Sequence, residues 1–149
     1  MKTLLKWNYL FALLMMCSVP LFMSCGDDDD PTDPDNPGNV TGEYIGWKDN
    51  GNTATFGYKS SAYGVSVTAM YTLTFDGSGE NAKCTKCRIE ETYPSDAIAS
   101  EIESDYKSEP EYYKNVKRSG KKVSYDDDAF IGDTRKEIKS ILELAFGNK

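Results

Sequence analysis

Residues 65–76 carry the clearest structural signal in the chain, a strict alternation of apolar and polar side chains. Five of the six even positions are polar, and every odd position is apolar: Val65, Val67, Ala69, Tyr71, Leu73 and Phe75. Because successive side chains of a strand point to opposite faces, this pattern predicts a β-strand with one buried face. The fold must therefore contain a sheet with one covered side.

Turn signals on both sides of this strand predict hairpins. Asn50-Gly51 suits a two-residue turn, because both residues tolerate positive φ. The predicted pairing sets four core residues on one face, with Ile45 opposite Phe56 and Trp47 opposite Ala54.

A second turn is predicted at residues 76–79, followed by a return strand over residues 82–93. Cys87, Ile89 and Tyr93 then share one face, whereas Cys84 falls on the other parity, which predicts a β-bulge between the two cysteines. A third hairpin is expected around Ser119-Gly120, where a two-residue loop would set Val116 opposite Val123.

Two segments have helical periodicity. Ser95 can cap a helix that runs to about Lys107, with Ile98, Ile102 and Tyr106 recurring every four residues. Thr134 and Glu137 form a capping box for a second helix over residues 135–146, and Gly147 ends it. The apolar stripe of this second helix is predicted to be Ile138, Ile141, Leu142 and Ala145.

These elements predict an α+β fold in which an antiparallel sheet of hairpins carries two helices packed on one face. The order from Tyr71 to Phe146, with its YTLTF strand, TYPS turn, hairpin and final helix, resembles small ββαββα lipoprotein domains of Bacteroidota. That resemblance implies a fold and no activity.

Residues 1–24 have the layout of a secretory signal peptide. Lys2 and Lys6 precede an apolar run that ends at Met23, and small Ser24 stands before Cys25. A transmembrane anchor is the alternative, but the run is shorter than the roughly 20 residues that a spanning helix needs. Phe-Met-Ser-Cys at residues 22–25 resembles the lipobox of bacterial lipoproteins, and Cys17 is a second, poorer candidate. The resemblance implies cleavage before Cys25 and acylation of Cys25, which would anchor the chain in a lipid bilayer.

The acidic run Asp27, Asp28, Asp29 and Asp30 follows at once. CGDDDD resembles the start of Bacteroidota lipoproteins that are exported to the cell surface, which implies that the run is an export signal and that the protein is anchored in the outer membrane. A solvated tether is the alternative. Residues 31–39 contain three prolines and no apolar side chain, so residues 25–39 are predicted to be a spacer. Residues 40–149 form the single predicted domain.

Composition excludes several chemistries. The chain has no histidine, which removes Ser-His-Asp and Cys-His nucleophiles, a histidine base and histidine-ligated zinc. Of 24 acidic and 17 basic residues, six acids lie in the spacer and two lysines in residues 1–24. The domain is therefore nearly balanced in charge, and no nucleic-acid partner is expected. Neither a catalytic residue, nor a metal site, nor a cofactor is predicted.

The cysteines at 84 and 87 form a CxxC motif. A redox pair normally needs a helix N-terminus, and a metal half-site has no histidine to complete it. A disulfide would have to close the roughly 10 Å that three extended residues span. Two small packing residues are the interpretation we favour.

Two surface features suggest binding. Five basic side chains in the last hairpin indicate either a protected sheet edge or a docking patch for an anionic partner: Lys114, Lys117, Arg118, Lys121 and Lys122. A weak candidate set for sugar stacking, otherwise a half-buried aromatic layer, is Trp47, Tyr58, Tyr63, Tyr112 and Tyr113.

The expected function is a non-catalytic, lipid-anchored extracytoplasmic binding or accessory module with a glycan or protein ligand. The alternatives are a protein inhibitor or partner-binding domain that uses an open sheet face, and a glycan hydrolase that uses two carboxylates.

Overall fold

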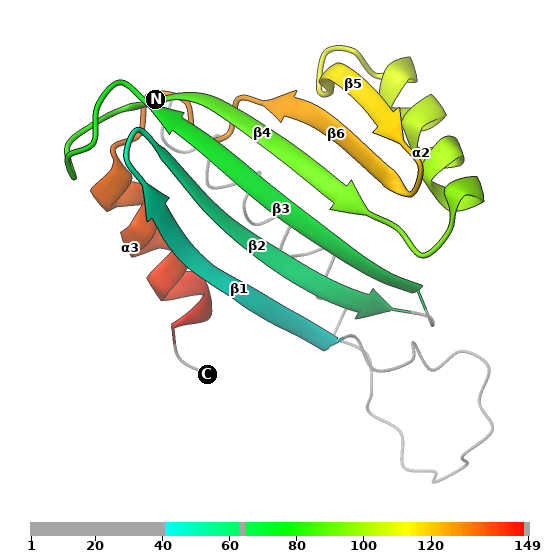
Figure 1. Cartoon of the computed structure of the whole chain (residues 1–149), viewed down its shortest axis with the longest axis horizontal. Helices are drawn as coiled ribbons and strands as arrows, with labels where there is room; N and C mark the ends of the chain where they lie inside the picture. Colours follow the sequence, from blue (N-terminus) through cyan, green and yellow to red (C-terminus); the bar gives the residue numbers. More distant parts are fainter. Residues whose placement is uncertain (1–40, 63–64, 148–149) are drawn as a thin grey trace, which may run out of the picture.

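The computed structural model describes residues 41–62 and 65–147, and its elements follow the predicted order (Figure 1). Three hairpins are present, with one helix after the second and one after the third. The strands are β1 (Thr41–Asn50), β2 (Thr53–Ala62), β3 (Val65–Phe75), β4 (Cys84–Thr92), β5 (Lys114–Ser119) and β6 (Lys122–Asp127). The helices are α2 (Asp96–Ser108) and α3 (Arg135–Phe146).

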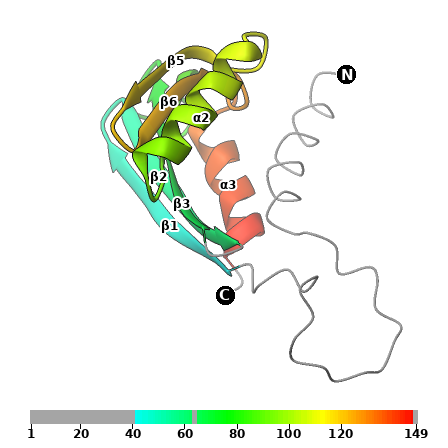
Figure 2. The ribbon, with the colours of Figure 1, turned by 90° about the vertical axis from the view of Figure 1, so that its right-hand side faces the viewer.

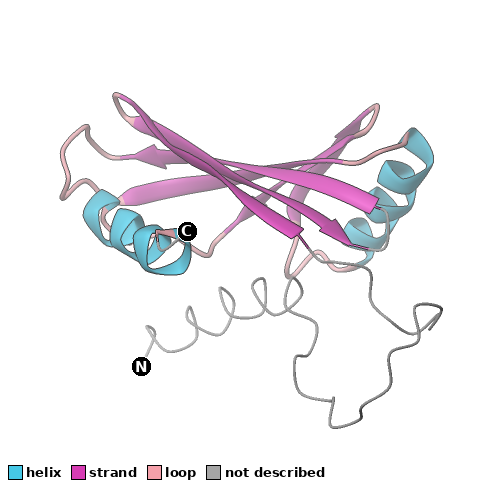
Figure 3. Cartoon of the chain, turned by 90° about the horizontal axis from the view of Figure 1, so that it is seen from below, coloured by secondary structure: helices cyan, strands magenta, loops and turns pink. Residues whose placement is uncertain are grey.

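The six strands form one antiparallel sheet in the order β1-β2-β3-β4-β6-β5. Both helices lie against the same face of this sheet, at opposite ends of it (Figures 2 and 3). Helix α2 contacts β5 and β6, and α3 reaches β1 and β2 through Phe146. The predicted α+β fold, a sheet of hairpins with two helices on one face, is confirmed.

The predicted register of the first and third hairpins is wrong. Asn50 pairs with Thr53, and Ser119 pairs with Lys122, so the two-residue loops are Gly51-Asn52 and Gly120-Lys121. Both glycines have positive φ, 61° and 58°, and the residues after them do not. This is the pattern of a type II′ turn, in which glycine takes the first central position rather than the second. As a result Ile45 lies opposite Gly57, and Val123 lies opposite Arg118.

A β-bulge in β1 changes which side chains of that strand face the helices. The register shifts between Ile45 and Lys48, so Gly46 and Trp47 together oppose Phe56. Tyr44 and Trp47 consequently both pack on the core, and Ile45, which was predicted to do so, does not. Glycine inside a strand is a common marker of such a bulge.

The bulge predicted in β4 is confirmed. Phe75 pairs with Cys84 and Thr74 pairs with Lys86, which leaves Thr85 as the extra residue. This insertion brings Cys84 and Cys87 onto the same face, where both are buried.

The main core lies between the sheet and α3. Phe56 of β2 stacks on Tyr71 of β3, with their ring centroids 4.6 Å apart, and Phe130 meets both rings edge-on from the loop after β6. The buried members are Ala54, Phe56, Tyr71, Leu73, Phe75, Cys84, Cys87, Ile89, Tyr125, Phe130, Ile138 and Leu142.

Both helix starts form as predicted. The Ser95 hydroxyl accepts a hydrogen bond from the backbone of Ile98, and Thr134 and Glu137 complete the capping box of α3. One position of the α3 stripe is wrong, because Ala145 is exposed. Phe146 packs inward in its place, four residues after buried Leu142.

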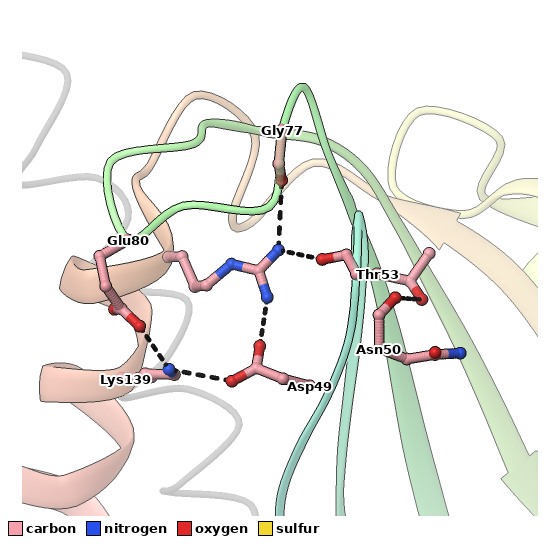
Figure 4. Close-up of polar contacts among 8 residues, drawn as sticks. Asp49, Asn50, Thr53, Gly77, Glu80 and Lys139 are labelled. Carbon is pink, nitrogen blue, oxygen red and sulfur yellow. Dashed lines mark hydrogen bonds and ion pairs between the residues drawn. The ribbon is translucent and has the colours of Figure 1, made fainter.

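Helix α3 begins with a buried arginine, whose side chain is only 2% exposed. Arg135 donates from Nη1 to the carboxylate of Asp49, and from Nη2 to the carbonyls of Gly51 at 2.8 Å and Gly77 at 3.3 Å (Figure 4). Its guanidinium also lies 4.3 Å from the centre of the Phe75 ring. One side chain therefore joins the turns of the first two hairpins to the start of the last helix.

A second, smaller core lies under α2 and contains Tyr93, Ala99 and Val123. Beside it Glu91 accepts hydrogen bonds from three tyrosine hydroxyls, those of Tyr93 at 2.6 Å, Tyr106 at 2.8 Å and Tyr125 at 3.2 Å. Burial, followed by the charge of Glu91, raises the pKa of all three phenols above the usual value. The carboxylate thus joins β4, β6 and α2.

We expect Leu142→Ala to lower the free energy of unfolding by about 2 to 5 kcal/mol, because it removes a leucine that is 3% exposed. The matched control is Leu144→Ala in the same helix, which should change it by less than about 0.5 kcal/mol, because Leu144 is 78% exposed. Urea unfolding measures both. Equal losses would contradict the packing of α3 described above.

We expect Arg135→Met to cost about 2 to 4 kcal/mol, because two hydrogen-bonded carbonyls lose their donor while Asp49 keeps its contact with Lys139. Lys136→Met, at the next and exposed position, should be nearly neutral in the same urea titration. An equally small effect of Arg135→Met would show that the two turns hold their places without it.

The raised tyrosine pKa values predict a loss of stability at alkaline pH. Phenols of the unfolded chain lose their protons near pH 10, whereas these three keep theirs to higher pH in the folded chain. Their contribution is therefore complete below pH 10 and falls above it, by about 1.4 kcal/mol per pH unit for each phenol. Urea midpoints between pH 9 and about 11.5 should fall less steeply for Tyr106→Phe, and an unchanged slope would contradict this assignment.

Candidate functional site

A surface pocket of about 320 Å³ lies between β1 and α3. Strand β1 contributes Tyr44 and Trp47, and the helix and its end contribute Lys139, Leu142, Glu143, Phe146 and Gly147. The volume is at the lower end of the range for ligand pockets. It suits one side chain or a small molecule.

The aromatic walls of this pocket are held by stacking. The ring of Tyr44 lies parallel to that of Phe146, 4.8 Å between centroids, and Trp47 stacks on Phe56 at 6.1 Å. The β1 bulge is what turns both Tyr44 and Trp47 toward α3. The walls are therefore fixed by the backbone of β1 and by the core beneath it.

One end of the pocket carries an ion-pair network, which Figure 4 shows beside Arg135. Lys139 Nζ lies 2.8 Å from Glu80, 3.0 Å from Asp49 and 5.5 Å from the centre of the Trp47 ring. The hydrogen bond to Glu80, supported by Asp49, raises the pKa of Lys139. The amine is charged, and two carboxylates already neutralise it.

The carboxylate of Asp49 is held in its ionised form. Its desolvation acts to raise its pKa, but the contacts with Lys139 and Arg135 outweigh this effect, and the net shift is downward. A general acid for glycoside cleavage needs a raised pKa. Asp49, with its lowered pKa, is thus poorly suited to be the acid of the hydrolase alternative.

The lining of the pocket also includes Glu143, which lies one helical turn after Lys139 in α3. Its side chain is exposed and forms no ion pair with any of the residues described. Burial, and then the charge of Glu143, raises the pKa of the Tyr44 phenol, which reflects how near the two groups are. A carboxylate that has no counter-ion among residues 41–62 and 65–147 therefore adjoins the aromatic wall.

The aromatic residues proposed from sequence do not form one surface. Trp47 lines the pocket. Tyr58 lies next to the pocket, because its ring centroid is 5.6 Å from that of Phe146, which also lines it. Tyr113 stacks on Tyr106 at 3.9 Å under the other end of the sheet, and Tyr112 beside it is half exposed. Tyr63 lies outside the described residues.

Sequence reasoning missed Tyr44 and Phe146, which complete the pocket with Trp47. Strict alternation along β1 places Tyr44 on the face opposite to Trp47. The predicted apolar stripe of α3 includes Ala145 and leaves out Phe146. Gly46 is the signal that would have corrected the first error, since it marks the bulge.

The face of the sheet away from the helices is polar. Alternation opposite the buried positions places threonines of β2 and β3 there, and no aromatic side chain of the described strands shares that face. Its charges pair across strands, Arg88 with Asp126 at 2.9 Å and Lys122 with Glu90 at 2.7 Å. Lys48, Lys59 and Lys86, which alternation places on the same face, are exposed and form no ion pair with the residues described.

The CxxC motif lies in a strand, and both its thiols are buried. Burial raises the pKa of Cys87 well above the usual value, and the charge of Asp127 adds to the shift. A thiol that keeps its proton is a poor nucleophile and a poor metal ligand. This environment supports the packing interpretation.

The basic hairpin is largely neutralised by the chain itself. Lys114 pairs with Asp128, Arg118 with Glu103 and Lys122 with Glu90. Glu103 has a lowered pKa because of its hydrogen bonds from Lys107 and Arg118. These pairs favour the protected-edge interpretation over a docking patch for anions.

Other expectations fall on residues that the structure does not describe. The signal peptide, Cys25, Asp27 to Asp30 and the spacer all precede residue 41. Within residues 41–62 and 65–147, no three histidine, cysteine, aspartate or glutamate side chains lie close enough together to hold a metal ion. In the same residues, no helix is long and apolar enough to cross a membrane.

Comparison with known proteins finds no match for this chain. No family model, no curated protein and no solved structure matches this chain.

Proposed function

We propose that this protein is a lipid-anchored, extracytoplasmic protein-binding module of the outer membrane that faces the cell exterior. The anchor rests on the lipobox-like FMSC at residues 22–25, and the outward orientation on the acidic run that follows it. Two or three acyl chains on Cys25 would hold the protein on a bilayer stably.

The observation that carries the binding role is the pocket between β1 and α3. It combines aromatic walls with two charged residues, Lys139 and Glu143, the usual composition of a site that fixes one orientation of its ligand. It also opens at the edge strand of the sheet, where a partner can approach the backbone of β1.

A protein ligand fits this site better than a glycan. Trp47 has Phe56 stacked on it and the Lys139 amine over its ring, and Tyr44 is stacked on Phe146. These contacts already use part of each ring surface, which leaves less of it for a flat sugar ring to stack on. A single side chain of a partner needs only the space between the rings.

The open sheet face is the second surface considered for a partner. Two ion pairs of its strands, Arg88 with Asp126 and Lys122 with Glu90, are already made, and Arg88 is also hydrogen-bonded to Ser124 at 2.8 Å. Docking there would bury paired charges without new partners, which costs free energy. In the pocket, Glu143 has no ion pair within the described part of the chain, so a partner there can supply a counter-ion to it.

Replacement of Cys25 tests the anchor. We expect Cys25→Ser to appear in the soluble fraction or to persist as the uncleaved precursor, because the sulfur that would carry the lipid is gone. Cys17→Ser is the matched control and should still sediment with membranes. A cleaved Cys25→Ser protein that stays on membranes would contradict the proposal.

The acidic run provides the second arm of the same experiment. A variant with Asp27 to Asp30 changed to alanine should keep its lipid but resist protease added to intact cells. Digestion equal to that of the unchanged protein would mean that the run is a tether and not a signal.

A further inference from the structure

The charge in the β1–α3 pocket that is not already paired within the described residues is negative. Lys139 is held between Asp49 and Glu80, and Asp49 also binds Arg135. Glu143 then remains at the rim without an ion pair among the described residues. Of the two charged residues that line the pocket, Lys139 is already paired and Glu143 has no ion pair among the described residues, so an anionic ligand would meet repulsion from Glu143.

The aromatic walls of the pocket also attract positively charged groups. The negative faces of aromatic rings attract an ammonium or a guanidinium within about 6 Å of the ring centre. Tyr44, Trp47 and Phe146 supply three such rings on two elements. The Lys139 amine, at 5.5 Å from the Trp47 ring, already occupies a position of this kind inside the molecule.

We infer that the pocket between β1 and α3 receives a lysine or arginine side chain of a partner protein, its alkyl stem against Leu142 and Phe146 and its charged head near Glu143. This inference rests on the proposed protein-binding role and names the chemistry of the partner at that site. Long basic side chains suit the pocket because they pair an apolar stem with a charged tip.

The chain contains its own reporter for a test. It has two tryptophans, Trp7 and Trp47, so in the full chain with Trp7→Phe the fluorescence of Trp47 alone reports on the pocket. The probes are N-acetyl-arginine amide and its uncharged analogue N-acetyl-citrulline amide. We expect the arginine probe to bind with a Kd of about 1 mM and the citrulline probe at least threefold to fivefold more weakly.

Glu143→Gln should lower the affinity for the arginine probe by about threefold to fivefold and leave the affinity for the citrulline probe unchanged. Glu101→Gln, an exposed glutamate of α2, is the matched control and should change neither. Thermal unfolding of each variant verifies that the fold is intact.

Three outcomes would overturn the inference: equal affinity for the two probes, no effect of Glu143→Gln, or no saturable change at about 20 mM probe. Equal and measurable binding of both probes would leave the pocket as a binding site and remove only its preference for cations. Loss of membrane anchoring in the fractionation experiment is a separate result and does not affect this one.

Discussion

The contact between Arg135 and the first two hairpin turns is the interaction on which the rest of the arrangement depends. The sheet is built from hairpins that are local in sequence, and nothing within one hairpin sets its position relative to α3. Arg135 sets this position, because its guanidinium donates hydrogen bonds to Asp49, Gly51 and Gly77, which lie up to 86 positions away in sequence. The pocket follows from this contact, because it lies where α3 passes β1.

Much of the fold follows from the sequence because its signals are local. Alternation over residues 65–76, the capping residues Ser95 and Thr134, and the odd spacing of Cys84 and Cys87 each depend on a few neighbouring residues, and each is confirmed. The errors occur where two local solutions compete. Asn50-Gly51-Asn52 allows a turn with glycine second or glycine first, and the choice shifts every pair in the hairpin.

The candidate site was less predictable than the fold. Trp47 was singled out because it is aromatic, but its partners Tyr44 and Phe146 come from a bulge and from the last residue of a helix, which periodicity does not place. Arg135 is the extreme case, because charged residues are almost never fully buried unless they are paired, and its partners are far away in sequence. The aromatic residues grouped by type alone, among them Tyr58 and Tyr113, are instead separated by the width of the sheet.

The extra residue in β4 has a consequence for chemistry in addition to geometry. By turning Cys84 and Cys87 inward together, it places the only thiols of the described chain where oxidants and metal ions have little access, and burial there raises the pKa of the Cys87 thiol. The native state then needs neither disulfide formation nor a thiol–disulfide isomerase to be reached.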